Sequence, residues 1–247
     1  LDPCMDFELG AAPAEAALAS RPRAVIVNSA NNPTGAVYDE AILHRLVEGC
    51  RRAGVWLLSD ETYADLAWGK PFASLAGLSS PGLVVISSLS KVLGIPGFRT
   101  GWAVSTPAVA ERIARSTSTL LSCLPRFVQA GAEAGLRVVD VYAGISRIRY
   151  ARTVARAVGA LDGVPGIACV PPASAFYLFV DVRGTGVDGA TFAHRLLAEQ
   201  ATAVTPGAAF GDAFRGHVRL ALCGPTEDVE AGVAAVADLA RVLTGAC

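Results

Sequence analysis

The sequence predicts an α/β fold, because short apolar runs of strand length alternate with longer amphipathic stretches of helical period. Residues 24–28, 55–59 and 83–87 each have the pattern of a buried parallel strand. From about residue 145 an arginine-rich helix is followed by shorter strands with helices between them. This order predicts a parallel sheet first and a smaller α+β domain after it.

The elements of the first part are expected in a simple order. They are a helix at 14–18, a strand at 24–28, a turn at 31–35, a helix at 39–53, strands at 55–59 and 83–87, and helices that start at 106 and continue past Pro125 to 136. Asp39 is placed to cap its helix. His44 lies off the apolar stripe of that helix and is expected in solvent.

The second part begins with the arginine-rich helix. Its arginines are expected on an exposed face and Ile148, Val154 and Val158 on the apolar side, so a helix that links two domains is favoured over a nucleic-acid patch. Strands are expected at 167–170, 176–182, 203–204 and 217–223, and helices at 191–200 and 227–243. We predict two domains, over residues 1–140 and 141–247.

Composition narrows the class of protein. Of the 247 residues only 17% are charged, below the roughly 25% usual in soluble domains, so surface is expected to be buried against a partner. A net charge of −1 gives no reason to expect nucleic acid or an anionic membrane, and no apolar run is long enough to span a bilayer. Six scattered cysteines and the absence of a visible secretory signal favour reduced thiols in a cytoplasmic protein, without a metal site.

The stretch at 87–102, SSLSKVLGIPGFRTGW, carries the strongest chemical signal. Lys91 follows an apolar strand and has few charged neighbours in the sequence, which favours a partly desolvated amine able to form a Schiff base. Arg99, eight residues later, would bind a phosphate through two parallel hydrogen bonds. A reactive lysine beside hydroxyls and a phosphate-binding arginine is typical of a pyridoxal-phosphate site. The alternative is a solvated surface lysine.

Two further motifs strengthen this interpretation. Residues 28–35 read NSANNPTG, and residues 59–63 read SDETY. In this order, followed by SLSK and the later arginine, they resemble the fold-type I pyridoxal-phosphate-dependent aminotransferases of class I/II. The resemblance implies a three-layer α/β/α large domain with a mainly parallel sheet, incomplete here, and a smaller α+β C-terminal domain. The chain lacks the family's usual N-terminal third, which either lies outside this sequence or is supplied by a second chain.

The resemblance also implies roles for residues of the large domain. Lys91 would carry the cofactor, Asn32 and Tyr63 would contact its phenolic oxygen, and Asp60 would pair with its pyridine nitrogen. A carboxylate there keeps the ring protonated, so that the ring accepts electrons from an α-carbanion. Standing alone, Asp60 would be interpreted as a helix N-cap. The residues implied at the phosphate are Ser88, Arg99 and, with weaker support, Ser90, while Glu61 is interpreted as structural.

Two segments of the small domain also match the family. Residues 175–177 read AFY, with Ser174 where members often carry glycine, and residues 206–211 read PGAAFG. Arg219 lies among apolar strand residues, where an unpaired guanidinium is costly. The resemblance assigns it to the substrate α-carboxylate, and the alternative is an internal salt bridge. His194 and His217 are interpreted as structural.

These features together predict a homodimeric aminotransferase that exchanges an amino acid with a 2-oxo acid. The same residues would serve a β-eliminase (C–S lyase), a decarboxylase or a cyclising enzyme of the same fold. A different alternative is a non-catalytic fragment, or a subunit that needs a partner chain. Retention of Lys91, Asp60 and Arg99 argues against the loss of chemistry.

Overall fold

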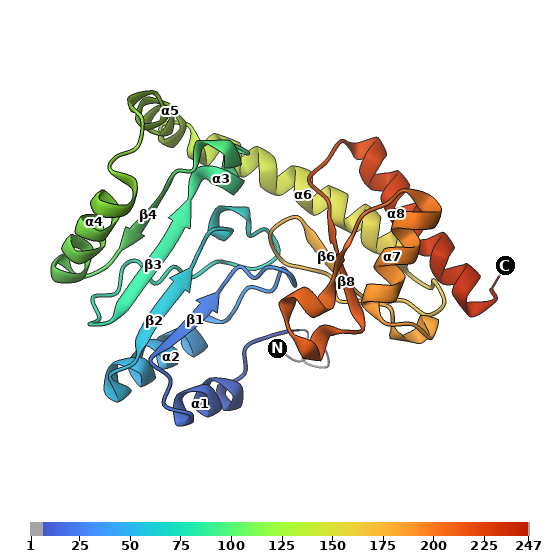
Figure 1. Cartoon of the computed structure of the whole chain (residues 1–247), viewed down its shortest axis with the longest axis horizontal. Helices are drawn as coiled ribbons and strands as arrows, with labels where there is room; N and C mark the ends of the chain where they lie inside the picture. The colour runs from blue at the N-terminus through green and yellow to red at the C-terminus, as the bar shows by residue number, and fades with distance from the viewer. Residues whose placement is uncertain (1–6, 247) are drawn as a thin grey trace. The chain divides into compact units, whose positions relative to one another are not determined.

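The computed structural model describes residues 7–246, which form two compact units (Figure 1). Unit 1 consists of residues 7–31 and 36–147, and unit 2 of residues 32–35 and 148–246. The turn that follows the first strand therefore belongs with the C-terminal half of the chain. Four cysteines, Cys50, Cys123, Cys169 and Cys223, are free thiols, while Cys4 and Cys247 lie outside the described residues.

Unit 1 is built on a four-stranded sheet in the order β1-β2-β3-β4. Strands β1 to β3 are parallel, and β4 joins the edge antiparallel to β3. The elements are α1 (Ala11–Ala19), β1 (Ala24–Asn28), α2 (Glu40–Ala53), β2 (Trp56–Asp60), η2 (Ala64–Leu66), β3 (Leu83–Ser88), α3 (Leu89–Val92), η3 (Pro96–Phe98), β4 (Gly101–Val104), α4 (Pro107–Leu121), α5 (Arg126–Leu136) and the start of α6 (Val139–Leu161).

One face of this sheet is covered by α2. Val27, Leu57 and Val85 from successive strands pack against Leu43 and Leu46 of the helix, in one buried cluster. This arrangement follows from the sequence, because alternate residues of each strand point to the same face and the helix has an apolar stripe. Packing against α2 therefore holds the parallel strands, and with them the residues at the strand ends, in fixed positions.

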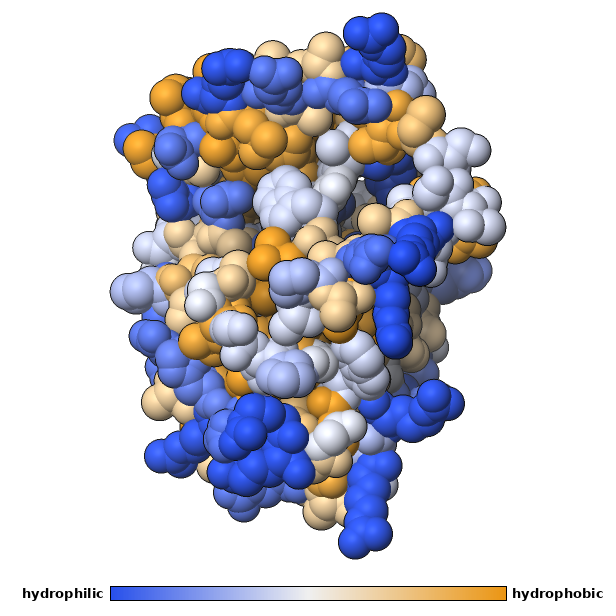
Figure 2. Space-filling view, turned by 90° about the vertical axis from the view of Figure 1, so that its left-hand side faces the viewer, coloured by the Kyte–Doolittle hydropathy of each residue, from blue (hydrophilic) through white to orange (hydrophobic). Residues whose placement is uncertain are grey.

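The opposite face of the sheet is open within the described residues. Ile26 of β1 is 72% exposed, and Ile86 of β3 is exposed as well. Helix α4 is amphipathic but has no buried residue, and Leu120 and Leu121 at its end are exposed. Figure 2 shows apolar surface interspersed with polar side chains on the side of the molecule that carries α4. Parallel strands are normally covered on both faces, so this face is suited to a further layer of polypeptide.

Unit 2 is an α+β structure with an antiparallel sheet in the order β5-β6-β8-β7. Its elements after α6 are β5 (Ala168–Cys169), β6 (Tyr177–Asp181), η4 (Arg183–Thr185), α7 (Gly189–Gln200), β7 (Thr205–Pro206), η5 (Gly207–Phe210), η6 (Asp212–Phe214), β8 (His217–Ala221) and α8 (Thr226–Thr244). The side chain of Asp188 accepts a hydrogen bond from the Thr191 amide and caps α7. The predicted fold class, an α/β sheet followed by a smaller α+β part, is confirmed.

Three local predictions are corrected. Asp39 precedes α2 but makes no capping hydrogen bond with its side chain; its Oδ1 lies 3.0 Å from Nζ of Lys70 instead. Ile148 is 58% exposed while Val154 is buried, because six residues at about 100° each place them on different sides of a helix. The third strand of the small sheet lies at Thr205–Pro206, two residues later than predicted, where Thr205 pairs with Arg219.

No helix within residues 7–246 has the length and apolar character that crossing a membrane requires.

Candidate active site

Asp60 lies at the carboxyl end of β2, level with Asn28 of β1 and Ile86 of β3. Its main-chain oxygen accepts a hydrogen bond from Nδ2 of Asn28 at 3.1 Å, and its Oδ1 accepts one from the Thr62 amide at 3.0 Å. Across the described part of the chain its side chain has no other hydrogen bond and no ion pair. One oxygen of a held, half-buried carboxyl group is therefore available to a ligand.

Tyr63 and Lys91 meet beside this strand end. Tyr63 is buried after β2, and Nζ of Lys91, on α3 directly after β3, lies 5.9 Å from the centroid of its ring. The two predicted residues therefore lie together in unit 1. Short connections from neighbouring parallel strands place both there, because the carboxyl ends of parallel strands share one edge of the sheet.

Lys91 differs from the other lysine of the chain in its contacts. The sequence has only Lys70 and Lys91. Lys70 is held between Glu8 and Asp39, with 3.0 Å from its Nζ to a carboxylate oxygen of each. The half-buried Lys91 makes no hydrogen bond or ion pair with any described residue. Its amine is therefore not committed to a protein carboxylate.

Ser88, Ser90 and Arg99 line a common groove of about 820 Å³ in unit 1. The groove runs over the open sheet face beside α4, and Asp60, Tyr63 and Lys91 are not part of its lining. Arg99 has a left-handed backbone conformation with φ 54°, and its Nη1 donates to the main-chain oxygen of Pro96 at 3.0 Å. The guanidinium remains exposed. The three groups predicted to bind a phosphate are thus gathered on one surface.

Arg219 of β8 is held by neutral groups of unit 2. Its Nη1 donates to Oδ1 of Asn32 at 2.9 Å, and its Nη2 donates to Oγ1 of Thr205 at 3.1 Å. The guanidinium carbon lies 4.4 Å from the ring centroid of Tyr177 and 5.1 Å from that of Phe210. Thr205 was missed from the sequence, because the strand that carries it was predicted two residues too early.

The internal salt bridge left open for Arg219 does not form. No carboxylate of the described residues lies within 4.0 Å of its nitrogens, and its buried Nε has no hydrogen-bond partner among them. A half-buried cation without a counter-charge carries a desolvation cost, which a bound anion would offset. The guanidinium is thus suited to a carboxylate ligand.

The NPTG turn is fitted to the segment before β6. Gly35 has φ +70°, and a side chain there would bring its Cβ to 2.3 Å from Cβ of Pro172. The main-chain oxygen of Gly35 accepts hydrogen bonds from the Ala173 amide at 3.0 Å and from Oγ of Ser174 at 2.8 Å. Ser174, which stands where family members often carry glycine, therefore has a buried polar partner.

Comparison with known proteins decides the family. The sequence profile described as "Aminotransferase class I and II" matches residues 1–236. The chain belongs to this family. The resemblance inferred from the three motifs is therefore confirmed.

Named relatives of this aminotransferase-family chain agree. The arginine–pyruvate transaminase AruH of Pseudomonas aeruginosa is 31% identical, over 97% of this chain and 61% of its own length. The aspartate aminotransferase of Thermotoga maritima is 33% identical, over 86% of this chain and 55% of its own. A Thermus thermophilus aspartate aminotransferase double mutant superposes with a TM-score of 0.89 at 26% identity, covering 96% of this chain and 62% of that one. The chain spans about three-fifths of the length of these relatives.

The described residues fit the cofactor on which this family depends. The amine of Lys91, which has no counter-ion, suits the aldehyde of pyridoxal phosphate, and the free carboxylate oxygen of Asp60 suits its ring nitrogen. The hydroxyls of Ser88 and Ser90 and the guanidinium of Arg99 suit its phosphate.

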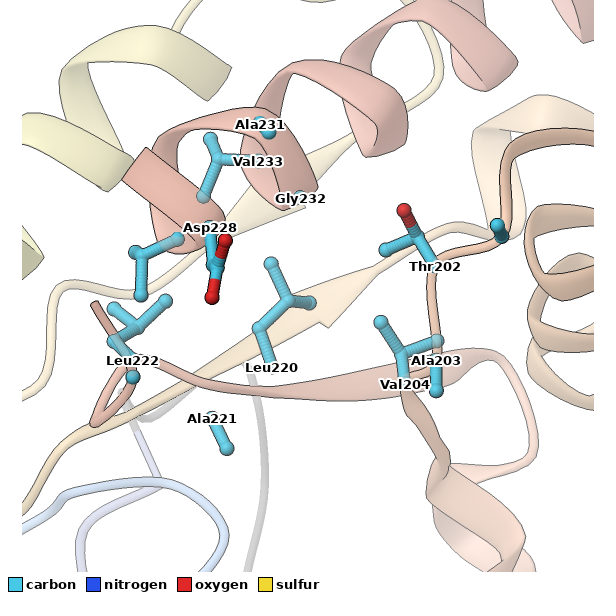
Figure 3. Close-up of a pocket in the computed structure, with 13 residues that line it drawn as sticks. Thr202, Ala203, Val204, Leu220, Ala221, Leu222, Asp228, Ala231, Gly232 and Val233 are labelled. Carbon is cyan, nitrogen blue, oxygen red and sulfur yellow. The ribbon is translucent and has the colours of Figure 1, made fainter. Parts of the chain in front are cut away.

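Another hollow, in unit 2, contains none of the predicted site residues. Figure 3 shows this pocket of about 410 Å³ between β8, the start of α8 and residues 201–204. Its lining is mostly small and apolar, and Asp228 is the one charged side chain in it. We assign it no role in the chemistry of the family.

Proposed function

We propose that this chain acts in a pyridoxal-phosphate-dependent aminotransferase, with the cofactor held on Lys91 as a Schiff base. The observation that carries the proposal is the contrast between the two lysines: Lys70 is paired with two carboxylates, and Lys91 with none of the described residues. An uncommitted amine at the end of a parallel strand is the group such a cofactor requires. When bound, the cofactor supplies an electron sink for the bonding electrons at the substrate Cα.

The residues of unit 1 have separate tasks in this proposal. Lys91 would act as a general base that takes the proton from the substrate Cα onto its Nζ. Asp60 presents its unbonded carboxylate oxygen to the ring nitrogen and keeps that nitrogen protonated. Tyr63, whose ring lies next to Lys91, donates to the phenolic oxygen. Ser88, Ser90 and Arg99, which line one groove, would hold the phosphate of the cofactor.

Two residues of unit 2 complete the assignment. Arg219 binds the α-carboxylate of the amino acid or the 2-oxo acid, because its charge is not balanced by any described carboxylate. Asn32, which already accepts a hydrogen bond from Arg219, uses its side-chain amide for the phenolic oxygen of the cofactor. The side-chain identity of the substrate is left open, and β-elimination, decarboxylation and cyclisation would use the same residues.

The quaternary structure is part of the proposal. Apolar side chains are exposed on α5 and on the first half of α6, among them Phe127, Val141 and Ile145. These support a homodimer, in line with the low share of charged residues. The open sheet face around Ile26 supports the alternative of a subunit completed by a further polypeptide layer. The cytoplasmic location expected from the scattered thiols stays a prediction.

Reductive trapping tests the proposal directly. The purified chain is incubated with pyridoxal phosphate, reduced with borohydride and mapped by peptide mass. With only two lysines in the sequence, the adduct falls on Lys91, on Lys70 or on the chain's amino terminus. Adduct on Lys91, retained in Lys70→Ala, supports the proposal. Adduct on Lys70 or on the amino terminus alone, in a folded chain, contradicts it.

A further inference from the structure

Glu61, next to the predicted ring-nitrogen partner Asp60, is a buried acidic residue with a complete set of partners. Its side chain is only 4% exposed. Oε1 accepts hydrogen bonds from Oγ of Ser59 at 3.0 Å and from the Leu75 amide at 2.9 Å, and Oε2 accepts one from Oγ of Ser74 at 2.5 Å. The side chain thus ties the end of β2 to the loop that precedes β3.

The main chain of Glu61 is fixed as firmly as its side chain. Its amide donates to the main-chain oxygen of Ile86 at 2.8 Å, and its own oxygen accepts from Oγ of Ser87 at 3.2 Å. Both partners belong to β3, the strand that leads directly to Ser88 and Lys91. Glu61 therefore links three segments, which are the end of β2, the loop at 74–75 and the end of β3.

Glu61 affects Asp60 through the peptide group between Glu61 and Thr62. The amide that binds Oδ1 of Asp60, at 3.0 Å, is that of Thr62, which belongs to the Glu61–Thr62 peptide group. A peptide group is planar, so fixing the main chain of Glu61 also fixes the direction of the Thr62 N–H. The main chain of Asp60 is held separately by Asn28. The orientation of the Asp60 carboxyl group is thus set by a peptide that Glu61 holds in place.

We propose that Glu61 is a positioning residue of the cofactor site, an inference that rests on the proposed function. Its anchored side chain directs the Thr62 amide at Oδ1 of Asp60, so that the second carboxylate oxygen would be available to the ring nitrogen. Burying an acidic side chain costs free energy that an apolar side chain at the same place would not cost. The three donors that bond Glu61 offset this cost and keep the end of β2 in one geometry. Hydrogen bonds weaken steeply with misalignment, so a loose Asp60 would bind the ring poorly.

The first test needs no cofactor. Hydrogen exchange of the Thr62 amide, followed by NMR on the folded chain, reports whether its bond to Asp60 is formed. In Glu61→Ala we expect this exchange to become at least about tenfold faster, as local opening becomes easier. In Glu61→Gln, which keeps an accepting oxygen for Ser59 and Leu75, we expect an intermediate value. If Glu61→Ala fails to fold, Glu61→Gln is compared with the wild type by itself.

Thr185→Val is the matched control. Thr185 is also buried, and its Oγ1 donates to the Val182 oxygen at 2.6 Å, but it lies in unit 2. The substitution Thr185→Val removes a buried side-chain hydrogen bond and changes no contact at the end of β2. We expect it to lower thermal stability and to leave the exchange of the Thr62 amide unchanged. Unchanged Thr62 exchange in folded Glu61→Ala and Glu61→Gln would overturn the positioning role.

The second test uses the loaded protein. Glu61→Ala is expected to keep the borohydride adduct on Lys91, to lower kcat about a hundredfold, as small misplacements of reacting groups do, and to shift the pH dependence of the cofactor's absorbance toward that of Asp60→Ala. In the Asp60→Ala background the same substitution should change neither quantity further, because Glu61 acts through Asp60. Full additivity would contradict the proposal. Absence of any Lys91 adduct in the wild type would contradict the proposed function instead, and the exchange test would remain decisive for Glu61.

Discussion

Arg219 donates a hydrogen bond from Nη1 to Oδ1 of Asn32 at 2.9 Å, although the two residues are 187 positions apart in the sequence. Asn32 belongs to the turn after β1, yet the segment 32–35 is part of unit 2. Gly35 of the same segment is bonded to Ala173 and Ser174, so the turn is held at two points against the small sheet. One motif of the first half of the chain thus completes the surroundings of an arginine in the second half.

Replacing Arg219 tests its assignment to the substrate carboxylate. In Arg219→Ala we expect kcat/KM for the amino acid to fall by roughly 10- to 150-fold, the range for loss of a hydrogen bond to a charged group, with most of the change in KM. Arg219→Lys should recover little, because an ammonium cannot form two parallel bonds to a carboxylate. Arg195→Ala is the control, since Arg195 pairs with Glu199 on the surface of α7. Unchanged KM in Arg219→Ala would exclude the role.

Replacing Lys91 tests the chemistry itself. Lys91→Ala removes the uncommitted amine, and we expect loss of the borohydride adduct at this position and a fall of at least about a hundredfold in turnover, the lower range for a lost general base. The melting temperature should change little, because Lys91 makes no hydrogen bond or ion pair with the described residues. Lys70→Ala should behave in the opposite way, with lower stability and normal turnover, since Lys70 bridges Glu8 and Asp39. Normal turnover in Lys91→Ala would contradict the assignment.

The sequence was sufficient for those features that depend on neighbouring residues. The strands at β1, β2 and β3 follow from apolar runs, and α2 follows from its apolar stripe. The exposure of Ile148, on a different side of α6 from buried Val154, also follows from the helical repeat alone.

Other features depend on contacts that no local pattern encodes. Strand β4 is four residues long and begins with Gly101, and it is a strand because Trp102 and Val104 pair with Ser87 and Val85. The bonds of Arg219 to Asn32 and Thr205, and those of Glu61 to Ser74 and Leu75, likewise require the folded chain. The sequence therefore identified candidate residues by type and motif, while their partners required the structure.

The NPTG glycine offers a test of packing within unit 2, between the turn and the segment before β6. Gly35→Ala places a methyl group 2.3 Å from Cβ of Pro172 and also requires φ +70° of a residue with a side chain. We expect a loss of about 2–4 kcal/mol in the free energy of unfolding, the sum of backbone strain and steric overlap. Gly54→Ala is the matched control, because Gly54 has φ +66° with nothing within 4 Å of the added carbon. It should cost only the backbone part. Equal losses in the two variants, measured by urea unfolding, would show that Pro172 does not constrain the turn.

His217 predicts how the stability of unit 2 depends on pH. The residue is 2% exposed, its ring stacks on Phe179 with 4.8 Å between centroids, and it pairs with Asp181 across the sheet. Burial lowers the pKa of His217; the negative charge of Asp181 opposes this shift and the positive charge of Arg183 adds to it. Below the unfolded pKa of about 6.5 the unfolded chain therefore binds a proton that the folded chain binds less readily. Stability should be complete above that pH and should fall as the solution is acidified.

The measurement is the melting temperature between about pH 7.5 and pH 5, where histidine is the side chain whose ordinary pKa lies in the range. We expect a fall on acidification in the wild type and a flatter profile in His217→Leu. His194→Ala is the control and should keep the wild-type slope, because His194 is exposed on α7.

Asp181 acts in a more acidic window: burial raises the pKa of its carboxyl group, but the hydrogen bonds from Arg183 outweigh this and hold it below its usual value. The stabilisation from Asp181 is therefore lost only at lower pH, so a slope that survives in His217→Leu between pH 7.5 and pH 5 would have to come from another group.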